Sequence, residues 1–256
     1  MTNTEIPSIE HSMAVSSHIL TPEFFARSVY DVAPDLIGCH LFTTINGVRT
    51  GGMIIETEAY REDDPFAHCF SDDKIERPSH VDAMFASPGS VYFYYSGQLP
   101  CLNIACEGEG IGSAVLVRAL LPVCNPDAML DRRLSWYIET GRSPPKVLES
   151  EASRVRNLCN GPGVLCEALG VADVSKLSAI TIFDPPFEVR SFTRRPTVAS
   201  GIRIGLDAMY KRWMKNGDHR ANLSSVDAFG AAKRRWVASE FRRYCRHPST
   251  EQEWKR

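Results

Sequence analysis

The segment Glu56-Thr57-Glu58-Ala59-Tyr60 places two carboxylates and a tyrosine at alternate positions. It closes the run GMIIETEAY, which has the composition of a strand. Alternation along a strand directs Glu56, Glu58 and Tyr60 to one face. A carboxylate two residues from an aromatic ring suits a base that has left a duplex, because the ring can stack on the base while the carboxylate reaches the sugar. The alternative is an acidic strand end that faces solvent.

Four consecutive aromatic residues, Tyr92 to Tyr95, precede Ser96 and Gly97 at the expected tip of a hairpin. A packed strand accepts only alternate residues on its inner face, so two of the four must face another surface or protrude. Protruding aromatic side chains suit stacking on bases or wedging between them. An aromatic-rich strand, or a surface for another protein, is the alternative.

Two polar residues interrupt apolar strands: Asn103 in LNIAC and Arg118 in VLVRAL. Such a side chain must find a hydrogen-bond partner within the core or line a cavity. His68 lies in the loop after the acidic strand end, and with Cys69 and His80 it raises the alternative of a metal hydrolase. Scattered ligands without zinc-site spacing make no framework, so we expect no metal.

The elements that must position these residues alternate between strands and helices. We expect hairpins around Asn46-Gly47 and Ser96-Gly97 and a further strand over 111–120, which together imply an antiparallel sheet. Residues 61–87 have the composition of a long loop with a short helix near 79–86, and loops of this length are usually functional. Helices are expected from Pro22, over 126–140 and 150–169, and, as an amphipathic arginine-rich helix, over 226–246. The fold class is therefore α+β.

Charge is distributed unevenly along the 256 residues. The chain has a net charge of −2, but residues 1–189 hold 13 Lys+Arg against 25 Asp+Glu, and residues 190–256 hold 16 against 6. This asymmetry indicates either a basic surface for a polyanion or a basic helix packed on the acidic remainder.

The bulk composition excludes several classes of protein. Hydrophobic residues make up 43% and charged residues 23%, which is typical of globular proteins, and no apolar run has the ~20 residues of a membrane helix. No secretory signal is evident at the N-terminus, so we expect the eight cysteines to be free thiols and the protein to be cytoplasmic, near the nucleoid in a bacterium.

Taken in order, the motifs LIGCHL, GMIIETEAY, Ala67-His68, MFASPGSVYFY, CLNIAC, VLVRALLP, ASRVRNLCNGPGVLCEALG and RIG resemble the alkyladenine (3-methyladenine) DNA glycosylase family. Each is short, but the ordered set, from about Thr21 to Gly205, is highly specific. The resemblance implies one mixed domain around a curved antiparallel sheet, flanked by helices, with a protruding hairpin that inserts into DNA. It also implies a monomeric, cofactor-free enzyme that acts on double-stranded DNA and removes alkylated or deaminated purines, such as 3-methyladenine, 7-methylguanine and hypoxanthine.

The resemblance assigns roles to individual residues. Glu58 matches the general base, and Arg118 matches the arginine near the attacking water. Three aromatic side chains match those that contact the flipped base: Tyr60, His68 and Tyr94. Asn103 matches the asparagine that helps to reject normal guanine.

The chain also departs from the family pattern. The hairpin is one residue short, so the residue that wedges into DNA falls on Tyr95 or Ser96, and we favour Tyr95 because serine cannot fill a vacated base stack. Leu99 is a further alternative for this role. The family's C-terminal strand, which supplies a carbonyl to the water site, has no clear counterpart. We therefore expect a disordered tail over 1–20, a glycosylase domain over 21–225 and a basic helical extension over 226–256. A catalytically weak nucleic-acid-binding protein with the same fold is the alternative.

Overall fold

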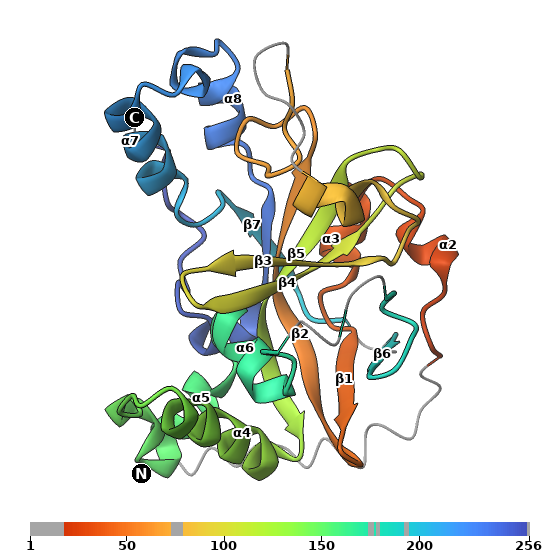
Figure 1. The fold of residues 1–256 in the computed structure, drawn as a ribbon, viewed down its shortest axis with the longest axis vertical. Helices are drawn as coiled ribbons and strands as arrows, with labels where there is room; N and C mark the ends of the chain where they lie inside the picture. Colours follow the sequence, from red (N-terminus) through yellow and green to blue (C-terminus); the bar gives the residue numbers. More distant parts are fainter. Residues whose placement is uncertain (1–17, 73–78, 174–176, 178–179, 192–194, 255–256) are drawn as a thin grey trace.

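The computed structural model describes residues 18–72, 79–173, 177, 180–191 and 195–254. Eight strands in this part of the chain form one sheet, in the order β3-β4-β5-β2-β1-β6, with β8 pairing β2 and β7 pairing β8 (Figure 1). All neighbouring pairs are antiparallel. The strands are β1 (His40–Ile45), β2 (Val48–Arg61), β3 (Val91–Ser96), β4 (Leu99–Ala105), β5 (Ser113–Cys124), β6 (Phe187–Arg190), β7 (Val198–Gly201) and β8 (Arg235–Ala238).

Helices flank this sheet, which confirms the expected α+β class. The α-helices are α2 (Pro22–Phe25), α3 (Val29–Asp35), α4 (Pro126–Glu139), α5 (Glu151–Leu158), α6 (Pro162–Leu169), α7 (Leu206–Asn216) and α8 (Val226–Ala231). Short 3-10 helices are η1 (Ser79–Phe85), η2 (Lys146–Leu148), η4 (His219–Asn222) and η5 (Ser239–Tyr244). None of the described helices is long and apolar enough to cross a membrane.

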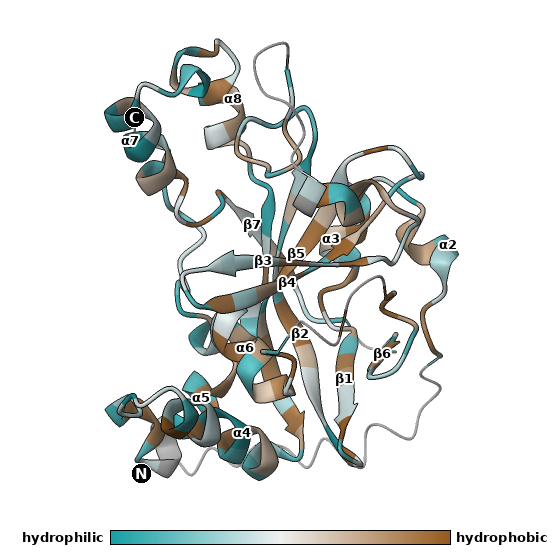
Figure 2. Ribbon diagram, viewed as in Figure 1, coloured by the Kyte–Doolittle hydropathy of each residue, from teal (hydrophilic) through white to brown (hydrophobic). Residues whose placement is uncertain are grey.

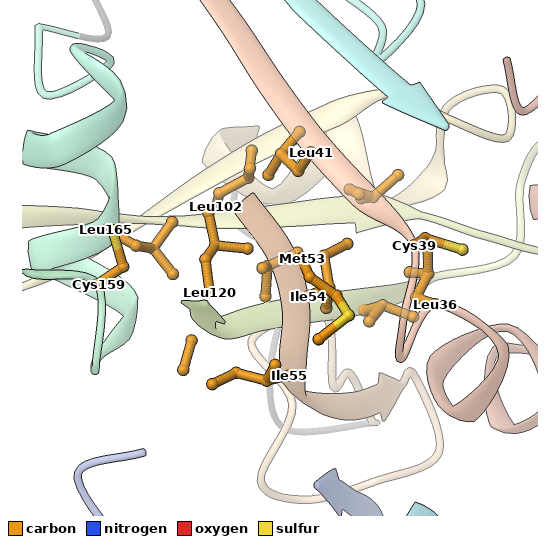
Figure 3. Packing of buried hydrophobic residues seen from close by; sticks show 14 of the residues in the cluster. Leu36, Cys39, Leu41, Met53, Ile54, Ile55, Leu102, Leu120, Cys159 and Leu165 are labelled. Carbon is orange, nitrogen blue, oxygen red and sulfur yellow. The ribbon is translucent and has the colours of Figure 1, made fainter. Parts of the chain in front are cut away.

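The main hydrophobic core lies between the central strands and the helices that cover them. Figure 2 shows hydrophobic residues concentrated on these strands, and hydrophilic ones on the outer helices such as α7. Figure 3 shows Leu36, Ile54, Leu102, Leu120 and Leu165, which come from elements far apart in the sequence and belong to one extended cluster, and each is at most 1% exposed. Burial of such side chains contributes about 1.5–3 kcal/mol each, so the core fixes the strands that carry the polar residues.

Strand β2 organises the sheet because it is long enough to serve three partners. One of its edges pairs with β5. The other edge pairs first with β1, as far as Met53, and then with β8, from Glu56 to Glu58. Without β8, buried backbone groups beside Glu56 and Glu58 would lack hydrogen-bond partners, which is costly.

The expected hairpins are confirmed, and their turns have the geometry that the residues favour. Asn46 and Gly47 link β1 to β2 with positive φ angles of 51° and 76°, as in a type I′ turn. Gly97 adopts a φ of 67° between β3 and β4. The short helix near 79–86 is also confirmed, as η1.

The structure corrects three boundaries. The helix expected over 150–169 is two helices, because Pro162 cannot sit inside a helix and instead starts α6. The strand expected to end near Pro122 continues to Cys124. Leu20, which was expected to lie in a disordered tail, is 4% exposed and donates its backbone N–H to Val189, while residues 1–17 lie outside the described part.

The prediction of a single helix over 226–246 is wrong. This segment forms α8, strand β8 and the 3-10 helix η5. Local sequence favoured a helix, but the open edge of β2 recruits Arg235 to Ala238 as a strand. The residues that follow position 225 therefore contribute to the sheet. Strand β8 lies directly beside Glu58, with Arg235 opposite it.

His40 gives the fold a testable dependence on pH. Burial lowers the pKa of this imidazole from its ordinary 6.5 to about 4. Between these two pH values the imidazole therefore binds more protons in the unfolded chain than in the folded chain. The contribution of neutral His40 to the free energy of unfolding is fully present above pH 6.5 and is lost as the pH falls toward 4. We expect the free energy of unfolding in urea to fall by about 2 kcal/mol more between pH 7 and pH 5 in the native chain than in His40→Phe. Equal pH dependence in the two proteins would contradict this assignment.

Candidate active site

Glu58 lies at the centre of a buried cluster on the second half of β2. Its side chain is 0% exposed, and three donors contact its carboxylate. Tyr60 Oη donates to Oε2 at 2.9 Å, Arg118 Nη1 donates to Oε2 at 3.1 Å, and the Ile204 backbone N–H donates to Oε1 at 2.7 Å. A carboxylate accepts about four hydrogen bonds. Oε1 therefore retains one position at which it could accept a proton from water.

Arg118 joins Glu58 to a second buried carboxylate, Glu56. Its Nε donates to Glu56 Oε1 at 3.1 Å, and Arg235 Nε donates to the same oxygen at 2.6 Å. Arg235 is 0% exposed and also donates to the carbonyls of His247 and Ser249. The result is an alternating network of two carboxylates and two guanidinium groups, which is the arrangement that buried charges require.

Electrostatics keep Arg118 charged within this network. Burial alone would lower the pKa of its guanidinium, but the adjacent carboxylates of Glu58 and then Glu56 outweigh it and raise the pKa. The pKa of the Tyr60 hydroxyl is also raised, mainly by burial and next by the charge of Glu58. Tyr60 therefore remains a neutral hydrogen-bond donor to Glu58.

A cavity of about 200 Å³ is lined by Tyr60, Arg118 and Ile204, the three residues that donate to Glu58, whereas Glu58 itself is not part of its lining. This volume is below the about 300–1,000 Å³ of sites for drug-sized ligands and suits a single planar ring system. The cavity brings together six residues singled out from the sequence: Tyr60, His68, Tyr94, Ser96, Asn103 and Arg118. The remaining lining comes from Phe66, Met84, Tyr92, Cys101, Leu116, Pro162, Ile204 and Met209.

Aromatic side chains dominate the walls of this cavity. The rings of His68 and Tyr94 are in contact, with centroids 3.8 Å apart and planes inclined by 47°. On Tyr60, the guanidinium of Arg203 lies 4.6 Å from the ring centroid. Arg203 is itself held by Asp64, with Nη1 2.6 Å from Oδ2. One face of the Tyr60 ring is therefore occupied by Arg203, and the ring is fixed in orientation.

Asn103 enters the cavity from β4 as a constrained side chain. It is 6% exposed, and its Nδ2 donates to the Cys101 carbonyl at 2.9 Å. A fixed amide can discriminate between ligands because a ring that presents the wrong group to it loses a hydrogen bond.

The hairpin β3–β4 separates the two candidates for insertion into DNA. Alternation places Tyr92, Tyr94 and Ser96 on the cavity side. Tyr95 does not line the cavity and is 46% exposed. Leu99, at the start of β4, lies so close to Gly163 that a Cβ there would come within 2.6 Å of it. Tyr95 is therefore the large side chain that this hairpin presents to solvent.

Sequence reasoning missed several residues of the site. Arg203, Ile204 and Arg235 lie about 145 to 180 positions after Glu58, and no local pattern marks them as its partners. The only sequence feature that pointed to any of them was the short RIG motif, which contains Arg203 and Ile204. Among the described residues, no group of three or more His, Cys, Asp or Glu side chains could hold a metal ion. The side chain of His80, named in the metal alternative, lies outside the described part, and all eight cysteines are free thiols.

Comparisons with known proteins agree with this geometry. The family model for methylpurine-DNA glycosylase matches residues 23–217. A protein of Rhodopseudomonas palustris (strain BisB5), named "Putative 3-methyladenine DNA glycosylase", is 36% identical over 226 residues, covering 88% of this chain and 98% of the relative. Proteins with the same name from Nitrobacter winogradskyi and Nitrosospira multiformis are 40% and 39% identical, covering 73% and 71% of this chain and 77% and 81% of those relatives.

Proposed function

Because the chain belongs to the methylpurine-DNA glycosylase family, we propose that it flips alkylated or deaminated purines out of duplex DNA and hydrolyses their N-glycosidic bond with water activated by Glu58. The observation that carries this proposal is a buried carboxylate whose three hydrogen-bond donors, Tyr60, Arg118 and Ile204, all line an aromatic, base-sized cavity. The expected substrates are 3-methyladenine, 7-methylguanine and hypoxanthine.

The cavity suits recognition of an extruded base. Extrusion costs a few kcal/mol, and less when the base pair is damaged. Stacking on the aromatic side chains Tyr60, His68 and Tyr94 returns about 1–3 kcal/mol per base. An alkylated purine is cationic, and aromatic faces attract cations. The rings of His68 and Tyr94 touch each other, so a purine that stacks between them requires them to separate.

The charges behind the cavity suit cleavage of the bond. As the purine leaves, the sugar becomes positively charged, and a carboxylate at this point stabilises that charge. The same carboxylate can accept a proton from the attacking water, and the remaining acceptor position on Glu58 Oε1 is available for it. Arg118 orients Glu58 through Oε2 and is held in turn by Glu56. An alkylated base already carries positive charge and leaves without further protonation.

The test of this function is release of bases from a panel of duplexes. Each duplex carries one lesion (3-methyladenine, 7-methylguanine or hypoxanthine), and alkali then cleaves the strand at abasic sites. We expect cleavage that depends on the protein for at least the alkylated purines and none for undamaged duplex. Tight binding without cleavage on every lesion would overturn the proposal.

Tyr95 is expected to wedge into the stack that the flipped nucleotide vacates. Tyr95→Ala should slow base release from duplex DNA by about 10-fold or more, because loss of a stacking ring removes about 1–3 kcal/mol, while release from single-stranded DNA changes little. Ser96→Ala provides the matched control at the next position. If Ser96→Ala carries the duplex-specific loss and Tyr95→Ala does not, Ser96 is the residue that enters DNA.

A further inference from the structure

The segment after residue 217, outside the matched family model, carries exposed arginines close to the start of α6, where Pro162 lines the cavity. Arg243 and Arg246 belong to the end of η5 and the residues after it, and both are exposed. In Figure 1 this dark blue stretch passes beside α5 and α6. Backbone contacts fix it there: the Arg246 N–H donates to the Asn160 carbonyl at 2.9 Å, between the two helices.

A third exposed arginine, Arg156 on α5, completes this group. Its Nε donates to the Arg243 carbonyl at 3.1 Å, which ties α5 to η5. The guanidinium carbon of Arg246 lies 3.7 Å from the position that a Cβ on Gly161 would take. Among the described side chains, none of the three forms an ion pair with a carboxylate. We call Arg156, Arg243 and Arg246 the arginine surface.

The arginine surface continues a line that starts at the DNA-inserting hairpin. Leu99, at the base of the hairpin, packs on Gly163 of α6. Pro162, the residue before, lines the cavity. Gly161 precedes Pro162 in the chain, and the guanidinium group of Arg246 lies beside Gly161. A DNA strand whose nucleotide enters the cavity beside Pro162 therefore passes the start of α6, within reach of the exposed guanidinium group of Arg246.

We propose that the arginine surface binds backbone phosphates of the DNA strand beside the flipped nucleotide, so that the C-terminal segment forms part of the DNA interface. The proposal rests on the function proposed above. Exposed arginines without carboxylate partners are suited to phosphate oxygens, which they contact through parallel N–H groups. Such contacts carry no sequence information but set affinity and register. Two basic residues of the segment 190–256, Arg243 and Arg246, belong to this surface, whereas others, such as Arg203 and Arg235, pair with buried carboxylates.

The test compares two double variants of the full chain in binding to undamaged duplex DNA. Arg243→Gln/Arg246→Gln removes two charges from the arginine surface but leaves Arg156, whose Nε bonds to backbone. Each phosphate contact contributes about 0.9 to the slope of log affinity against log salt concentration. We therefore expect this variant to lower the slope by about 2 and to weaken binding at low salt. Arg142→Gln/Lys146→Gln removes the same charge from the exposed end of α4 and η2, and should leave the slope unchanged.

Base release from a lesion duplex separates this proposal from the proposed function. At saturating protein the Arg243→Gln/Arg246→Gln variant should release bases at the native single-turnover rate, because neither residue touches the cavity. An unchanged salt slope, or an equal fall in the control variant, would overturn the phosphate contacts even if base release is normal. Absence of base release by the native chain would overturn the proposed function, while a specific fall in the slope would still support the DNA interface.

Discussion

Glu58→Gln is expected to lower the single-turnover rate of base release by about 100- to 10,000-fold, the usual contribution of a general base. The amide cannot take a proton from water or balance the positive sugar. Binding to lesion duplex should survive, because Glu58 lies behind the cavity wall and is 0% exposed. The measurement is base release under excess protein, alongside binding of the same duplex. A variant that retains full activity would refute the assignment of Glu58 as the base.

Glu56→Gln provides the matched control for this substitution. It neutralises the other carboxylate bonded to Arg118 but leaves Glu58 itself intact. We expect a much smaller loss of rate than in Glu58→Gln. In Glu58→Gln the new NH₂ group would face the Ile204 N–H if the oxygen keeps Arg118 and Tyr60, which costs about 1–3 kcal/mol of stability. Unfolding in urea must therefore confirm that both variants are folded at the assay temperature.

Arg118→Met should have the second large effect, on stability and on activity together. Arg118 is 8% exposed and bridges Glu56 and Glu58. Removal of one partner from a buried ion pair costs about 3–5 kcal/mol, because the remaining charge loses its compensation. Glu58 would also lose the donor that orients Oε2, and displacement by about 1 Å can cost about 100-fold in rate. Urea unfolding and single-turnover base release measure the two effects.

Arg235→Met separates stability from catalysis in the same network. Arg235 is 0% exposed and its side chain bonds to the carboxylate of Glu56, whereas it lies opposite Glu58 only through the backbone pairing of β2 with β8. We expect a loss of stability comparable to that of Arg118→Met, with a much smaller loss of rate once the assay is run where both variants are folded. Equal losses of rate in the two variants would show that Arg118 acts through the fold alone.

The residues of the candidate site were found in the sequence because each sits in a short local pattern. Alternation in ETEAY is enough to place Glu56, Glu58 and Tyr60 together once the segment is a strand, and the buried network confirms that they share a face. Asn103 and Arg118 stand out because polar residues inside apolar strands need a reason. Both line the cavity.

The error over residues 226–246 shows where local patterns fail. Arg235 to Ala238 have no strong signal for a strand, and the surrounding arginines and apolar residues fit a helix. They form β8 because β1 pairs with β2 only as far as Met53, which leaves the β2 edge open at Glu56 to Glu58. The hydrogen-bonding requirement of a distant strand outweighs the local preference.

The sequence by itself therefore determined the strands β1 to β5, the hairpin tip and the side chains that could act on a base, because these depend on periodicities of a few residues. Only the tertiary structure decided what surrounds Glu58. Ile204 donates to it, Arg203 fixes Tyr60, and Arg235 holds Glu56, which in turn holds Arg118. These contacts join residues that are far apart in the chain, and they form because buried charges and buried backbone groups must find partners wherever the fold brings them.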